Sequence, residues 1–130
     1  MKVHSVFSGY SVNDQAIAKD FYTNTLGLEL ESEDMGLRFI LPGGGSVFIY
    51  AKDEHQAATF TVLNLVVADI DEAVKELTGK GVQFEMYDNL FDGANQEPSG
   101  IMRSPDAAKY GPSIAWFKDP AGNTLSVIQG

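Results

Sequence analysis

The chain has 130 residues, no cysteine, two histidines, and nine basic against eighteen acidic residues, which gives a formal net charge of −9. This length predicts a single domain, residues 1–130, with a hydrophobic core of ordinary size, and the missing cysteines exclude disulfides, iron–sulfur clusters and cysteine-based zinc sites. The acidic balance, with Arg38 and Arg103 as the two arginines, argues against nucleic acid as a partner, because phosphate binding needs clustered basic residues.

Residues 1–5 lack the apolar run of a signal peptide, and no segment is long and apolar enough to cross a membrane, so we expect a cytoplasmic protein. An apolar stretch over 3–12 then predicts a strand. Asp14 caps a helix of about three turns that ends at Gly27, since glycine accepts the left-handed conformation that closes a helix. Further strands follow over 28–31, 37–41 and 46–50.

The second half of the chain repeats this plan. Residues 12–22 align with 67–77 at an offset of 55, and residues 41–50 align with 119–128 at an offset of 78. The offsets differ by 23, which indicates an insertion in the second half over 88–112.

Each element of the second half therefore has a counterpart in the first. A strand over 59–67 leads to Asp69, which caps a second helix that ends at Gly81. The remaining strands are predicted over 82–85, 113–118 and 124–128. The pattern predicts an α+β fold of two tandem βαβββ units, 1–50 and 59–130, joined by a polar connector over 51–58.

The insertion is irregular in sequence and contains Phe91, Ile101, Met102 and Tyr110. These apolar side chains either let the segment close as a lid over an apolar cleft or pin it to the core. In the second case residues 99–103 could form an extra edge strand.

The duplicated units resemble the vicinal oxygen chelate superfamily, which includes glyoxalase I, extradiol dioxygenases, and fosfomycin and bleomycin resistance proteins. The resemblance lies in Phe21-Tyr22-Thr23 and Leu26-Gly27-Leu28 of the first unit and in residues 116–123 (WFKDPAGN) of the second. It implies that each unit curls its sheet into half of a cup, that paired units close a cavity, and that the protein is a homodimer. Metal-dependent members hold ligands in the first and last strands of each unit, at positions that correspond here to Phe7, Phe48, Val62 and Ser126.

Those positions do not carry the His, Gln or Glu side chains that a catalytic divalent cation needs. Three of the four have no donor atom, and the neutral hydroxyl of Ser126 is a poor ligand. Strand alternation points His4 away from the face of Phe7, and His55 lies in the connector. We therefore expect neither a metal nor a cofactor.

Alternation instead predicts a face of aromatic and sparse polar side chains opposite the helices. Tyr50 lies on this face with Phe48, whereas Val47 and Ile49 point to the helix. The candidate ligand-binding residues are Phe7, Arg38, Phe48, Tyr50, Val62, Asn64, Met102, Tyr110, Trp116 and Ser126. They form either an apolar pocket for a small molecule or, if Phe7 and Phe48 fill that space, a packed core.

The leading hypothesis is a metal-independent binding protein of the bleomycin resistance type, which holds an apolar or aromatic ligand that the acidic chain would allow to be cationic. The alternative is a diverged glyoxalase-like lyase or isomerase, with Tyr50 as the candidate acid or base. A third hypothesis is an accessory dimer without a ligand. The glycines at 43–45 predict a hairpin turn and no phosphate loop, and Asp119 and Asn123 predict a structural turn.

Overall fold

The computed structural model describes residues 1–87 and 95–130. It divides into two compact units, Met1–Ala57 and Ala58–Gly130. Phe91 of the insertion lies outside the described residues. Among the residues that the structure describes, no helix has the length and apolar character that crossing a bilayer requires.

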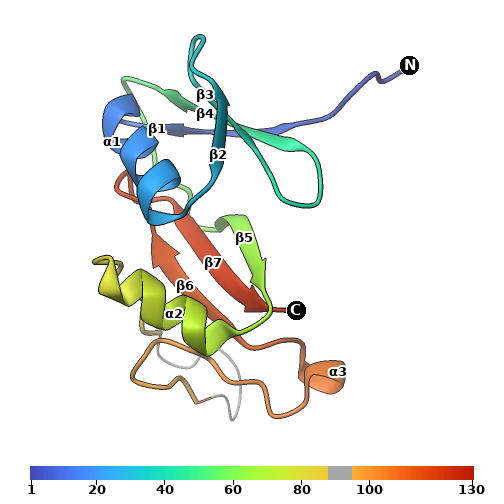
Figure 1. Ribbon diagram of the computed structural model, residues 1–130, viewed down its shortest axis with the longest axis vertical. Coiled ribbons are helices and arrows are strands. Elements are labelled where there is room, and N and C mark those ends of the chain that lie inside the picture. The colour runs from blue at the N-terminus through green and yellow to red at the C-terminus, as the bar shows by residue number, and fades with distance from the viewer. Residues whose placement is uncertain (88–94) are drawn as a thin grey trace. The chain divides into compact units, whose positions relative to one another are not determined.

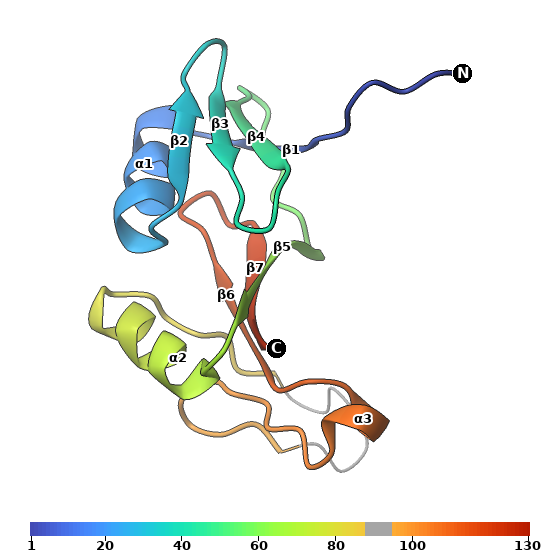
Figure 2. The same cartoon turned by 45° about the vertical axis from the view of Figure 1, so that its right-hand side comes forward.

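The first unit is a mixed four-stranded sheet with a helix along one face (Figure 1). Its elements are β1 (Ser8–Val12), α1 (Gln15–Asp20), the π-helical segment η1 (Phe21–Thr25), β2 (Glu29–Ser32), β3 (Leu37–Ile40) and β4 (Ser46–Ala51). The strand order is β1-β4-β3-β2, with β1 parallel to β4 and the other neighbours antiparallel, as Figure 2 shows.

The helical segment of the first unit is anchored at both ends and in its middle. The Asp14 side chain accepts a hydrogen bond from the backbone N–H of Ile17 at 3.0 Å, which satisfies a free donor of the first turn. Gly27, at φ +72°, follows the last turn in the left-handed conformation that the sequence predicts. Between them Tyr22 is fully buried against Phe39, so the helix covers one face of the sheet.

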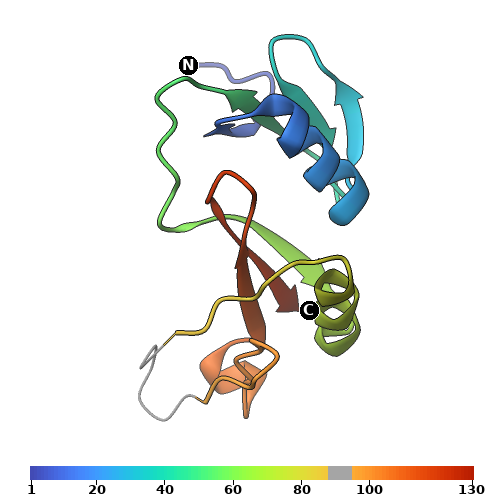
Figure 3. The same cartoon turned by 90° about the vertical axis from the view of Figure 1, so that its left-hand side faces the viewer.

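The second unit has a three-stranded sheet and, like the first, begins with a strand and a helix and ends with two antiparallel strands (Figure 3). Its elements are β5 (Thr61–Val67), α2 (Ile70–Gly79), α3 (Ala107–Tyr110), β6 (Ile114–Lys118) and β7 (Thr124–Gln129). The strand order is β5-β7-β6, with β5 parallel to β7 and β6 antiparallel to it.

Helix α2 packs on its sheet through Ile70, Val74 and Leu77, whose spacing places them on one helical face. Asp69 caps its start through the N–H of Glu72 at 3.2 Å. At its end Gly81 has φ +93°, and the N–H of the following residue bonds the carbonyl of Leu77 at 2.9 Å. This pairing is a Schellman motif, so the two predicted helix caps and both glycine stops are present.

The first predicted strand is too long at its start. Strand β1 begins at Ser8 and not at residue 3, because it is the edge strand and its neighbour β4 begins at Ser46, which leaves the preceding residues without a partner. His4 therefore lies before the strand, and the alternation used to orient it does not apply.

The predicted strand over 82–85 is also wrong in extent. Only Phe84 forms a bridge, to Phe117, and the next residue donates its N–H to the carbonyl of Trp116 at 2.8 Å. The rest of that edge of β6 is taken by Met102, which exchanges backbone hydrogen bonds of 2.8 and 3.2 Å with Ile114. The insertion thus replaces part of the strand that the first unit has at this edge.

The described part of the insertion is held down along its length. Ile101 is 2% exposed, and the side chain of Gln96 donates to the carbonyls of Glu85 and Gly100, each at 2.7 Å. Ile101 and Met102 attach their part of the insertion to the second unit, as in the second alternative, whereas Tyr110 is 64% exposed.

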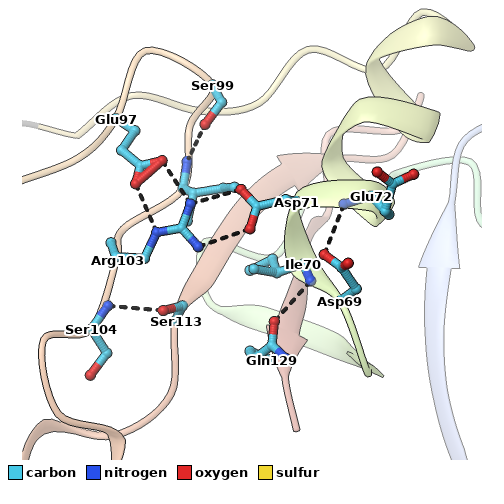
Figure 4. A network of polar contacts seen from close by, with 11 residues as sticks. Asp69, Ile70, Asp71, Glu72, Glu97, Ser99, Arg103, Ser104, Ser113 and Gln129 are labelled. Carbon is cyan, nitrogen blue, oxygen red and sulfur yellow. Dashed lines mark hydrogen bonds and ion pairs between the residues drawn. The ribbon is translucent and has the colours of Figure 1, made fainter.

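Arg103 ties the same segment to the start of α2 (Figure 4). Its guanidinium bonds both carboxylate oxygens of Asp71, at 3.0 and 2.7 Å, and both of Glu97, at 2.8 and 2.9 Å. Hydrogen bonds from Arg103 hold the pKa of each carboxyl below its ordinary value. The insertion is therefore fastened by charge as well as by packing.

Candidate functional site

The two sheets place corresponding residues in register across their middle. In the first sheet the row across β1, β4 and β3 is Gly9, Phe48 and Arg38. In the second sheet the row across β5, β7 and β6 is Asn64, Ser126 and Trp116. The backbone pairing thus reproduces the offsets of 55 and 78 that relate the two halves of the sequence.

Both rows face away from the helices. In β4, Val47 and Ile49 are buried on the helix side, whereas Phe48 between them is half-buried on the other face. In β7, the corresponding Leu125 and Val127 are buried on the helix side. In β4 this burial matches the partition that alternation predicts, whereas in β7 Ser126, on the face opposite the helix, is fully buried as well.

In the first unit, four predicted site residues form one group, which we call the aromatic cluster: Phe7, Arg38, Phe48 and Tyr50. The rings of Phe7 and Phe48 meet edge to face at 6.4 Å, and Tyr50 stacks on Phe48 at 5.8 Å. The guanidinium carbon of Arg38 lies 4.6 Å from the centre of the Phe7 ring and 5.5 Å from that of Phe48. These distances place the cation over both ring faces.

The aromatic cluster is accessible. Phe7 is 54% exposed, which argues against the alternative in which it fills a closed core. The Phe48 ring rests on the backbone of Gly36, where a Cβ would lie 2.6 Å from the ring's Cζ. The absence of a side chain at position 36 thus leaves room for the ring, and no local sequence pattern predicts this contact between a loop and a strand.

In the second unit, the corresponding face is polar at its centre. The Ser126 hydroxyl, fully buried, donates to Asn64 Oδ1 at 2.6 Å. The ring of Trp116 meets Tyr87 edge to face at 5.6 Å. Burial, aided by the nearby Glu85 carboxylate, raises the pKa of Tyr87.

Tyr87 is a further site candidate, which lies two residues beyond the predicted strand over 82–85. Alternation continued from Glu85 places Tyr87 on the Trp116 face. The sequence pattern therefore indicates this residue once the strand is extended past residue 85.

Three predicted residues take less central positions. Val62 lies at a register irregularity between Thr61 and Leu63, so alternation no longer assigns it to the row of Asn64. Met102 pairs with Ile114, two residues from Trp116 on the same edge strand, and thereby reaches the same face. Tyr110 is 64% exposed at the end of α3, with the ammonium of Lys109 at 5.0 Å from its ring centre.

The side chains at the four positions that hold ligands in metal-dependent members do not fit a divalent cation. The hydroxyl of Ser126 is committed to Asn64, and the other three are hydrocarbon. His55, in the connector, is hydrogen-bonded through Nδ1 to the hydroxyl of Ser11 in β1 at 2.7 Å. Across residues 1–87 and 95–130, no group of three or more His, Cys, Asp or Glu could hold a metal ion.

Comparison with known proteins places this geometry in a family. The family model of the Glyoxalase/Bleomycin resistance protein/Dioxygenase superfamily matches residues 3–127. Among curated proteins no match is found.

Solved structures are similar over nearly their whole length. A member of this superfamily from Sphaerobacter thermophilus is 26% identical, with 97% of this chain and 98% of that chain covered and a TM-score of 0.67. TnmS3, an antibiotic binding protein from Streptomyces sp. CB03234, is 24% identical, with coverage of 99% and 98% and a TM-score of 0.66. FosX, a fosfomycin resistance protein from Listeria monocytogenes, shares the fold at 15% identity, with coverage of 100% and 95% and a TM-score of 0.69. The chain therefore belongs to the Glyoxalase/Bleomycin resistance protein/Dioxygenase superfamily, the vicinal oxygen chelate proteins.

Proposed function

We propose that this protein binds a small aromatic or apolar molecule without the help of a metal ion. The observation that carries the proposal is the aromatic cluster, in which Phe7 and Phe48 stand at the positions that the family resemblance assigns to metal ligands and in which Phe7 is 54% exposed. An exposed ring packs well against a planar ligand, and these side chains offer no lone pair to a cation.

The polar groups of the two faces are few and fixed, as is typical of a small-molecule site. Tyr50 carries a hydroxyl at the rim of the stacked rings, and the Ser126–Asn64 pair supplies a hydrogen-bonded centre on the second sheet. In this proposal the protein acts in the cytoplasm as a homodimer. TnmS3 is named as an antibiotic binding protein, which is consistent with a role of the present protein in sequestering a drug or metabolite.

Ligand binding can be measured by thermal denaturation. We expect planar aromatic compounds to raise the melting temperature of the protein, because a ligand that binds the folded chain stabilises it. A ligand that binds the second unit would change the fluorescence of Trp116, the single tryptophan. We expect EDTA to leave the rise in melting temperature unchanged.

Variants locate the effect. Phe48→Ala should abolish the ligand-induced rise in melting temperature, whereas Phe21→Ala removes a ring of equal size from η1, on the helix side, and should leave that rise in place. A stoichiometric divalent metal whose removal abolishes binding would contradict the proposal. Turnover of the bound compound that disappears in Tyr50→Phe would instead identify a diverged lyase or isomerase.

A further inference from the structure

We propose that Arg38 makes the first unit select a planar aromatic ligand that carries an anionic group of the carboxylate type. This inference rests on the proposed function and names the ligand class of the same site. It depends on the position of the Arg38 guanidinium and on the fact that this group has no carboxylate partner among the described residues.

Arg38 lacks the carboxylate partner that Arg103, Lys19 and Lys80 each have. Arg103 bonds Asp71 and Glu97, and Lys19 and Lys80 each have a glutamate partner. Arg38 makes no ion pair with any described residue, and its Nη1 donates to the neutral hydroxyl of Ser46 at 3.2 Å. In a chain with twice as many acidic as basic residues, a half-buried arginine without a carboxylate partner is left with charge and donors for a ligand.

The surroundings of Arg38 fit the two parts of such a ligand. Phe7 and Phe48 lie against its guanidinium, so a ligand ring that packs against the exposed part of Phe7 brings a carboxylate attached to it within reach of the guanidinium N–H groups that no described residue binds. A guanidinium presents its donors in one plane, which matches the paired oxygens of a carboxylate. Position 38 is in β3, between β2 and β4, so the backbone that carries it is paired on both sides.

The same geometry disfavours a cationic ligand. A positive group that stacks on Phe7 or Phe48 meets the Arg38 charge within a few ångströms, at a site where partial burial weakens screening by water. The net charge of −9 acts in the opposite direction, because it repels anions at long range. A preference for anions that depends on Arg38 would therefore be a local property of this face.

Three probes of one shape test the inference: 2-naphthoate, its neutral amide 2-naphthamide, and the cation 2-naphthylmethylammonium. Their dissociation constants are measured by isothermal titration calorimetry at neutral pH and fixed ionic strength. We expect naphthoate to bind about tenfold or more tightly than the amide, because a charge-assisted pair adds to the shared ring contacts. The cation should bind most weakly.

Variants assign the preference to one side chain. Arg38→Gln should bring naphthoate to the level of the amide, Arg38→Lys should keep part of the preference, and Arg103→Gln, which removes the other arginine, should keep all of it. Retention of each variant's fold is checked by circular dichroism. Equal binding of the three probes with Phe48 dependence intact would overturn this inference and leave the proposed function standing. Binding of none of them would overturn both.

Discussion

The two units share a backbone register and differ in the chemistry that this register displays. Where the first unit has Phe48 and Arg38, the second has Ser126 and Trp116, at matching positions of matching strands. The first face carries a cation over exposed rings, and the second carries a buried hydroxyl bonded to an amide. The pairing of strands thus tolerates a complete change of side-chain chemistry at its centre, because both units keep buried apolar residues on the helix side.

The largest loss of stability should come from a substitution that gives the second unit the side chain of the first at the matching position. Ser126→Phe inserts a ring at a fully buried position and removes the partner of Asn64. We expect a loss of about 1–3 kcal/mol in the free energy of unfolding, the usual cost of overpacking. Urea denaturation measures it, and the reverse change, Phe48→Ser, should cost less because Phe48 is half-buried. Equal costs would show that the two faces are packed alike.

A smaller effect is expected at the loop beneath the aromatic cluster. Gly36→Ala places a Cβ 2.6 Å from the Cζ atom of Phe48, so the ring must turn away from its place. We expect roughly a 1 kcal/mol loss of stability, in the range of a strained side-chain arrangement, and a clear loss of aromatic ligand binding by calorimetry. Gly79→Ala is the control, since nothing lies within 4 Å of a Cβ at that position and its φ lies outside the left-handed region. Unchanged ligand affinity in Gly36→Ala would mean that the ring's position on Gly36 does not matter for binding.

A single hydrogen bond distinguishes the centre of the second face. Ser126→Ala removes the donor to Asn64 Oδ1, and the cost should be about 0.5–1.5 kcal/mol. The low end is expected because Asn64 is exposed and water can take the place of the lost donor. Denaturation of Ser126→Ala, of Asn64→Ala and of the double variant gives the coupling energy. A coupling near zero would show that this pair does not order the face.

The sequence predicts the repeated order of strands and helices more completely than it predicts the side-chain contacts on the sheet faces. Offsets of 55 and 78 locate the rows that the sheets confirm, since period-two alternation and turn glycines are local signals. The bulge at Val62, the bridge of Met102 to β6 and the placement of Phe48 on Gly36 depend on contacts between distant segments. No periodicity within one segment encodes such contacts, so these parts of the site required the structure.

The smallest effect concerns the insertion, which distinguishes the second unit in sequence. Arg103 lowers the pKa of Asp71 and Glu97, so the attachment is fully present above the ordinary pKa values of these carboxyls and is lost as the pH falls through the lowered ones. Hydrogen exchange of the amides around Ile101 and Met102, corrected for its intrinsic pH dependence, should therefore show protection near neutral pH and less of it in acid. Arg103→Gln should show the reduced protection at both pH values, whereas Lys80→Gln, which removes an exposed ion pair within α2, should follow the parent chain. Protection that is independent of pH in the parent would mean that packing of Ile101, and not the charge network, holds the insertion.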